Sequence, residues 1–93
     1  MSTPEGRVKA NIRKRLDELG AWYFMPPGGA YGRKGIPDFV GCYNGKFFAI
    51  EAKAGKGTTT VLQDITIKRI RAHYGIALVV NEENVDTFIG EIK

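Results

Sequence analysis

Two β-rich runs, residues 36–43 and 46–53, are separated only by Asn44-Gly45. This dipeptide is typical of a type I′ turn, because both central residues of that turn need a positive φ. A two-residue turn also fixes which residues of the two strands face each other. The sequence therefore predicts an antiparallel hairpin in which Tyr43 faces Lys46.

The register of this hairpin brings charged side chains together. Counting outward from the turn pairs Val40 with Ala49 and Asp38 with Glu51. Opposed side chains share one face of a sheet, with Cβ atoms roughly 4.5 to 5.5 Å apart, and two like charges at that spacing repel. Alternation along the strand adds Lys53 to the same face. The hairpin thus predicts a cluster of two carboxylates and one amine.

This cluster has the chemistry of a site for a hard divalent cation. Mg²⁺ prefers oxygen ligands, and a cation between two carboxylates cancels their repulsion. One or two carboxylates commonly hold Mg²⁺ in proteins, with substrate phosphates and waters as further ligands. Phosphodiester hydrolysis follows from these parts, with Mg²⁺ or Mn²⁺ as the expected cofactor.

A helix is predicted before the hairpin, over residues 3–19. Apolar side chains recur there at helical spacing, and Gly20 supplies a stop. Ser2 and Glu5 form the sequence pattern of a capping box. The same spacing directs Glu5 to the apolar side of the helix, so Glu5 could reach the metal through a water.

The other segments complete an α/β pattern. We expect a strand at residues 22–25 and a helix with a Thr N-cap at residues 60–74. A buried strand at residues 76–80 and a turn or short helix at residues 82–88 should follow. An edge strand could follow. The apolar stripe of the second helix consists of Gln63, Ile67, Ile70 and Tyr74, and Gly75 ends it. The order favours one α/β domain, residues 1–93, with helices flanking a mixed central sheet.

Composition excludes several classes of protein. Hydrophobic residues make up 43% and charged residues 26%, so neither disorder nor a coiled coil is expected. No apolar run approaches the roughly 20 residues of a membrane span. The single cysteine, Cys42, excludes an internal disulfide, and we expect it in the core. Without a secretory signal pattern, the expected location is cytoplasmic.

The charge balance is compatible with a polyanionic partner. Fourteen Lys and Arg against ten Asp and Glu give a net charge of +4. Tyr31, Arg33 and Lys34 lie in a glycine-rich loop just before the predicted carboxylates. We expect these three residues to contact DNA phosphates, although a solvated loop has the same composition.

Pro37-Asp38, followed after twelve residues by Glu51-Ala52-Lys53, resembles the PD-(D/E)XK nuclease superfamily. Glu5, the approach Gly35-Ile36-Pro37-Asp38, and Gln63 make the chain most similar to the VRR-NUC branch, including stand-alone viral members. The resemblance covers about residues 5–80. It implies a restriction-endonuclease-like fold and a metal-dependent DNA endonuclease.

The resemblance also implies roles for individual residues. Asp38, Glu51 and the Ala52 carbonyl would bind the metal, with Glu5 in its outer shell. Lys53 would orient or activate the attacking water, and Gln63 would steady Lys53 or the water, which completes the catalytic set Asp38, Glu51, Lys53, Gln63 and Glu5. Stand-alone viral relatives resemble Holliday-junction resolvases, which implies a homodimer acting on branched DNA such as four-way junctions. If the protein is viral, the resemblance implies a location inside a bacterial host. Neither a membrane nor a small-molecule cofactor is expected.

Several alternatives stay open at the level of sequence. The chain could be a catalytically silent DNA-binding module of the same fold, or a nuclease for linear, flap or single-stranded DNA. It could also be a structural partner protein whose charged hairpin meets another chain. Local roles could explain Asp38 as a turn residue after Pro37, and Glu5 and Gln63 as helix-start residues.

Overall fold

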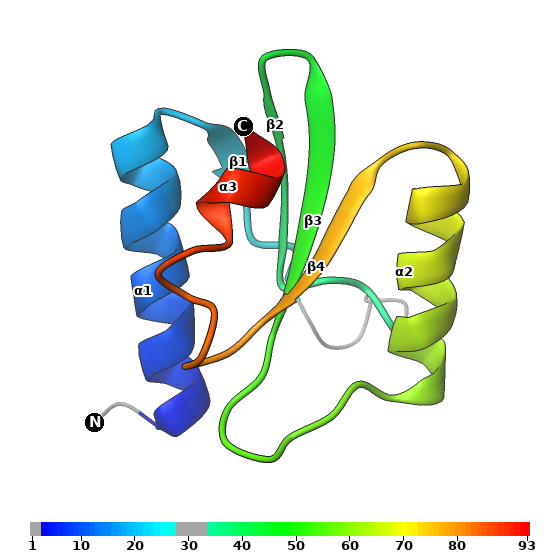
Figure 1. The fold of residues 1–93 in the computed structure, drawn as a ribbon. Coiled ribbons are helices and arrows are strands. Elements are labelled where there is room, and N and C mark those ends of the chain that lie inside the picture. Colours follow the sequence, from blue (N-terminus) through cyan, green and yellow to red (C-terminus); the bar gives the residue numbers. More distant parts are fainter. Residues whose placement is uncertain (1–2, 28–33) are drawn as a thin grey trace.

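The computed structural model describes residues 3–27 and 34–93, which form a sheet between two helical layers (Figure 1). In chain order the elements are α1 (Pro4–Leu19), β1 (Trp22–Phe24), β2 (Phe39–Tyr43), β3 (Lys46–Ala52), α2 (Val61–Ala72), β4 (Ile76–Val80) and α3 (Ile89–Ile92). The strand order is β1-β2-β3-β4, with β3 and β4 parallel and the other pairs antiparallel. The predicted mixed sheet flanked by helices is confirmed.

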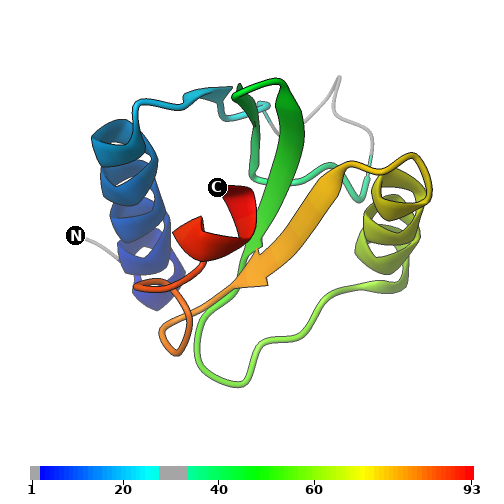
Figure 2. The ribbon, with the colours of Figure 1, turned by 45° about the horizontal axis from the view of Figure 1, so that its top comes forward.

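Helices cover the sheet on both faces. Helices α1 and α3 lie on one side and α2 lies on the other, as the turned view also shows (Figure 2). The main core lies on the α1 side, where β3 presents the buried residues Phe48 and Ile50. Because side chains alternate along a strand, Ala49 and Glu51 point to the α2 side. The predicted carboxylate cluster therefore lies on the opposite face from the main core.

The hairpin has the turn and register that the sequence predicts. Asn44 and Gly45 have φ angles of 50° and 79°, as a type I′ turn requires. The ladder runs from Tyr43 opposite Lys46 to Phe39 opposite Ile50. Strand β2 is shorter than predicted and begins at Phe39, because Pro37 has no N–H to extend the ladder. Asp38 therefore lies one residue before the last ladder pair.

The start of α1 differs from the prediction. Thr3, not Ser2, is the N-cap, and its Oγ1 accepts a 2.9 Å hydrogen bond from the N–H of Gly6. The predicted capping box is wrong, because the helix is capped by Thr3. The predicted inward position of Glu5 is also wrong, because Glu5 is exposed. Val8 is the first buried residue of the helix, so the turn that carries Glu5 extends beyond the covered part of α1.

Two further expectations are wrong. Cys42 is exposed, because strand alternation puts it on the α2 side of the sheet, near an edge that α2 does not cover. Tyr74 does not extend the buried stripe of α2. The helix ends at Ala72, and Tyr74 is 97% exposed with a φ of 66° where the chain turns towards β4.

The N-cap of α2 and the C-terminal segment agree more closely with the predictions from the sequence. The predicted Thr N-cap of α2 is confirmed, and the residue is Thr60. Residues 82–88 form turns, and the short helix α3 follows in place of an edge strand. In the two described ranges, no helix is long and apolar enough to cross a membrane.

Candidate active site

Asp38 is fixed against the end of β3. Its Oδ2 atom accepts a 2.8 Å hydrogen bond from the backbone N–H of Ala52. In a strand, the N–H and C=O of one residue point to the same side. The Ala52 carbonyl therefore faces the same edge as the Asp38 carboxylate, which brings two candidate oxygen ligands together.

Glu51 is the only buried residue with a polar or charged side chain in the described ranges, at 5% exposure. Burial raises the pKa of Glu51 to about 8, and its hydrogen bond with Asp38 and the charge of Asp38 raise it as well. The positive charge of Lys53 acts in the opposite direction. The protonated form of Glu51 is therefore favoured at neutral pH. The structure thus brings together the two carboxyl groups that the hairpin register predicts.

Lys9 belongs to this cluster, and the sequence analysis missed it. Its Nζ atom lies 3.5 Å from Asp38 Oδ1 and 3.4 Å from Glu5 Oε2. Partial burial lowers the pKa of Lys9, but the charges of Asp38 and Glu5 outweigh this effect and leave the pKa above 10.5. Lys9 is therefore a fixed positive charge beside Asp38. Its spacing of four residues from Glu5 was the available signal.

Three other predicted residues occupy different positions around the pair. Lys53 follows β3 directly, half-buried, and its charge reaches Glu51. Glu5 stands at the rim, where Lys9 holds it. Gln63 lies at the start of α2, where its Oε1 accepts a 2.9 Å hydrogen bond from Thr60 N–H in a capping box. The part of Gln63 in catalysis stays a prediction, as do the roles of Glu5 and Lys53.

Close contacts fix the chain on both sides of the pair. Gly35, three residues before Asp38, has a φ of 85°, and a Cβ there would lie 2.7 Å from the Leu62 carbonyl oxygen of α2. After β3, the N–H of Gly55 donates to both carboxylate oxygens of Glu82, each at 3.0 Å. The loops before Asp38 and after Lys53 are thereby anchored.

The donor set fits a hard divalent cation. The part of the chain that the structure describes has no group of three or more His, Cys, Asp or Glu side chains that could hold a metal ion. The protein would therefore contribute only two carboxylates, from Asp38 and Glu51, together with the Ala52 carbonyl. This set leaves coordination positions for waters and phosphate oxygens. Mg²⁺ sites are typically of this kind.

Only one of the three predicted DNA-contacting residues belongs to the described part of the chain. Tyr31 and Arg33 lie outside the described residues, whereas Lys34 is exposed at the start of the turn that leads to Asp38. Their role stays a prediction.

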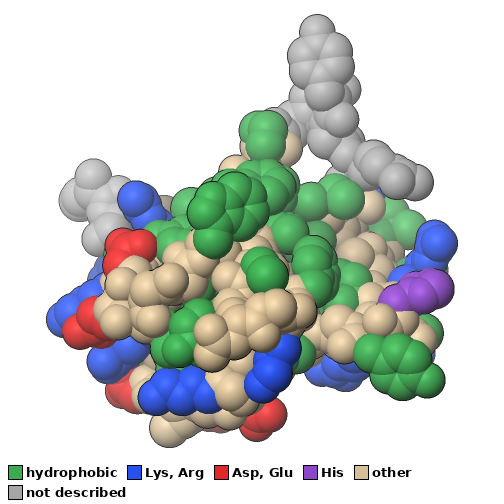
Figure 3. Space-filling view, turned by 90° about the horizontal axis from the view of Figure 1, so that it is seen from above, with side chains coloured by type: hydrophobic (Ala, Val, Ile, Leu, Met, Phe, Trp, Pro, Cys, Tyr) green, Lys and Arg blue, Asp and Glu red, His purple; other side chains and the backbone are tan. Residues whose placement is uncertain are grey.

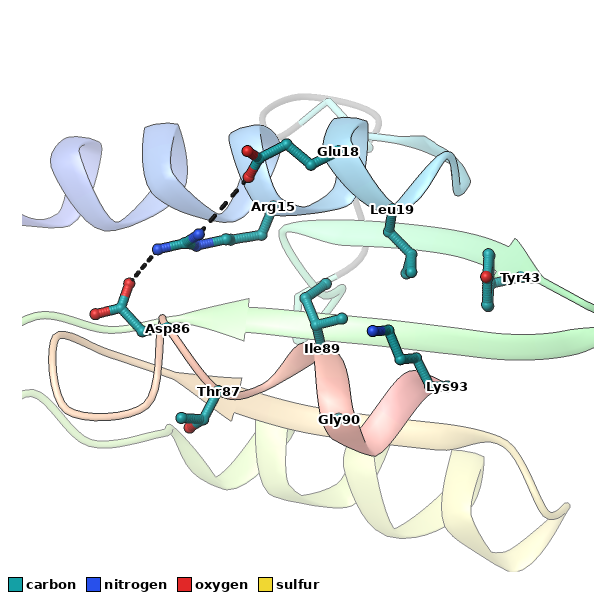
Figure 4. Close-up of a pocket in the computed structure, with 9 residues that line it drawn as sticks. All are labelled: Arg15, Glu18, Leu19, Tyr43, Asp86, Thr87, Ile89, Gly90 and Lys93. Atoms are coloured by element: carbon teal, nitrogen blue, oxygen red, sulfur yellow. Dashed lines mark hydrogen bonds and ion pairs between the residues drawn. The ribbon is translucent and has the colours of Figure 1, made fainter.

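A hollow of about 520 Å³ lies elsewhere, between α1 and α3 (Figure 4). Arg15 pairs there with Glu18 and with Asp86, at 3.7 and 2.5 Å. Because its guanidinium is already paired and the Asp38–Glu51 pair is not part of the lining, we assign the hollow no role in the site.

Comparison with known proteins agrees with the fold described above. The chain is similar over 99% of its length to a solved structure described as a VRR_NUC domain, of which it covers 100%. The TM-score is 0.84 and the sequence identity is 25%. No protein-family profile and no curated protein matches the chain.

Proposed function

Because this chain is a VRR-NUC domain, we propose that it is a DNA endonuclease that uses a divalent cation held by Asp38 and Glu51. The observation that carries the proposal is the contact between these two carboxyl groups, one of which is buried. Burying a carboxyl against a second one weakens a fold unless a cation or a proton compensates the charge. A function that needs both groups explains why they are there.

The residues present suit phosphodiester hydrolysis. Asp38 is oriented by the Ala52 N–H, so one ligand is held in place before substrate arrives. Bound Mg²⁺ or Mn²⁺ would polarise the phosphate. Lys53, beside Glu51, is placed to orient the attacking water and to stabilise negative charge that develops on the phosphate. Glu51 must lose its proton before it can act as a ligand.

Incubation with labelled DNA tests this proposal. Linear duplex, single strand, flap and four-way junction are each incubated with the protein in Mg²⁺, Mn²⁺ or EDTA. We expect cleavage with either metal and none in EDTA. Binding without cleavage under all metal conditions would favour the catalytically silent DNA-binding module.

We also propose that the active form is a homodimer that prefers four-way junctions. Trp22, Cys42 and Phe47 are successive partners across β1, β2 and β3, so they form a row on the α2 side of the sheet. Trp22 is 66% exposed, and Phe24 beside it is also exposed. Seen from above, hydrophobic side chains gather over the sheet between the helical layers (Figure 3). Such a surface supports association with a second copy.

Two other aromatic residues of these strands do not belong to this surface. Tyr23 and Tyr43 pack against the core on the α1 side. A two-fold dimer would supply the two symmetric cuts that resolve a junction.

Sedimentation of the purified protein and its Trp22→Lys variant tests the dimer. We expect a dimer for the natural chain and a monomer for Trp22→Lys, because a charge in this row opposes association. Tyr74→Lys is the matched control, since Tyr74 is an exposed aromatic in the turn after α2. A natural chain that sediments only as a monomer, or that cuts linear duplex as fast as junctions, would contradict the dimeric resolvase but not the metal site.

A further inference from the structure

We propose that Lys9 is a tethered counter-ion that holds Asp38 in the metal-free protein and competes with the divalent cation for this carboxylate. The inference rests on the proposed metal site at Asp38 and Glu51, and it assigns that site a further positioning residue. On this inference, the divalent cation replaces the Lys9 ammonium as the positive charge beside Asp38.

The two oxygens of Asp38 have different partners. Oδ2 accepts the hydrogen bond from Ala52 N–H at 2.8 Å, and Oδ1 faces the Lys9 ammonium at 3.5 Å. The backbone donor cannot move away without breaking the end of β3, whereas the lysine side chain can rotate. A cation that binds Asp38 through Oδ1 therefore displaces Lys9 and leaves the Ala52 hydrogen bond in place.

Glu5 gives the displaced ammonium a place to stay. Lys9 Nζ lies 3.4 Å from Glu5 Oε2, one helical turn away on α1. The two residues belong to the same helix, so this pair does not depend on Asp38. When Lys9 leaves Asp38, its charge remains at the rim of the site, where a substrate phosphate would approach. Glu5 thus acts on the site through Lys9.

The charges determine the direction of the effect on metal affinity. An ammonium beside Asp38 compensates negative charge when no metal is present. The same ammonium repels a divalent cation that binds a few ångströms away, so it weakens metal binding. The repulsion is moderate, because the Lys9 side chain is 31% exposed and water screens its charge.

Calorimetric titration with Mn²⁺, without DNA, tests the competition on the full chain. Lys9→Met removes the charge but keeps the length of the side chain, and Lys9→Arg keeps the charge. Lys14→Met makes the same change in net charge at an exposed position of the same helix. We expect Lys9→Met to bind Mn²⁺ about fivefold more tightly than Lys14→Met. Lys9→Arg should stay within about twofold of the natural chain.

Thermal unfolding in EDTA tests the other half of the proposal. Lys9→Met should melt at a lower temperature than Lys14→Met, because Asp38 then lacks its counter-ion, and saturating Mn²⁺ should remove most of this difference. Equal Mn²⁺ affinities for Lys9→Met and Lys14→Met, or weaker binding by Lys9→Met, would overturn the role of Lys9 and leave the metal site standing. Absence of Mn²⁺ binding in every protein, including the natural chain, would overturn the proposed function together with this inference.

Discussion

The backbone N–H of Ala52 donates a 2.8 Å hydrogen bond to the side chain of Asp38, which joins the residue before β2 to the last residue of β3. A backbone donor inside a sheet is fixed in direction, so it orients the carboxylate more firmly than a mobile side chain would. Glu51 precedes Ala52 and is buried against the same carboxylate. The geometry of the site therefore depends on the sheet, and its protonation state depends on Glu51.

Metal binding should release a proton. Burial, together with Asp38, raises the pKa of Glu51 to about 8, and only the carboxylate form is a good ligand. We expect Mn²⁺ affinity to rise between about pH 6.5 and 8.5, with up to about one proton released at the lower end. Calorimetry in buffers of different ionisation enthalpy measures this number. A heat that does not depend on the buffer at about pH 6.5 would show that Glu51 is already ionised.

The metal-free fold should lose stability as the pH rises. The pKa of Glu51 is raised from 4.5 to about 8, so between these values the folded state holds a proton that the unfolded state lacks. Stability from this group is therefore complete below about pH 4.5 and is lost as the pH approaches 8.

Urea unfolding in EDTA at about pH 5 and 8.5 measures this dependence. Glu51→Gln cannot ionise, so it should unfold with a weaker pH dependence and be more stable than the natural chain by about 1 to 2 kcal/mol at the higher pH. Equal slopes for the two proteins would contradict the raised pKa.

Lys53→Met should abolish turnover and retain metal binding. The ammonium acts on water and phosphate in the proposed mechanism and is not a ligand. Loss of its charge should raise the pKa of Glu51 further, because Lys53 lowers that pKa. The pH profile of Mn²⁺ affinity separates the two effects, because a raised pKa of Glu51 only shifts the rise in affinity to higher pH. Weak binding by the variant that does not improve as the pH rises would assign Lys53 to the metal site itself.

Gly35→Ala should lower both stability and cleavage. The position has a φ of 85°, and an added Cβ would lie 2.7 Å from the Leu62 carbonyl oxygen, so the loop before Asp38 must shift away from α2. We expect a cost of about 1 to 3 kcal/mol in the free energy of unfolding. Gly90→Ala is the control, since nothing lies within 4 Å of its added Cβ. Full activity in Gly35→Ala would show that this packing does not position Asp38.

Local sequence signals were sufficient to predict much of this fold. Asn44-Gly45 determines a hairpin because few other residue pairs accept two positive φ angles, and its register then carries Asp38 towards Glu51. Strand β4 has the predicted bounds, Ile76–Val80, because a continuous apolar run suits a strand covered on both faces.

The remaining features depend on how the helices pack on the sheet, which the periodicity of the sequence does not predict. The helical spacing of Glu5 gives its direction around α1, but not that its turn lies beyond the covered part of the helix. Cys42 looks like a core residue until the limited reach of α2 over β2 is known. Lys9 was missed because its partner Asp38 is remote in sequence and only the packing of α1 beside β2 and β3 brings them together.

The most direct test of the account is Mg²⁺-dependent cleavage of a labelled four-way junction by the Asp38→Asn variant. Asparagine keeps the size of the side chain and an oxygen for the Ala52 N–H, but it removes the charge that the cation needs. We predict that this variant retains the fold by circular dichroism, binds the junction, and cuts it at least about a hundredfold more slowly than Lys14→Met, which loses one charge outside the site. Cleavage by Asp38→Asn at the rate of Lys14→Met would contradict the assignment of the metal site to Asp38 and Glu51.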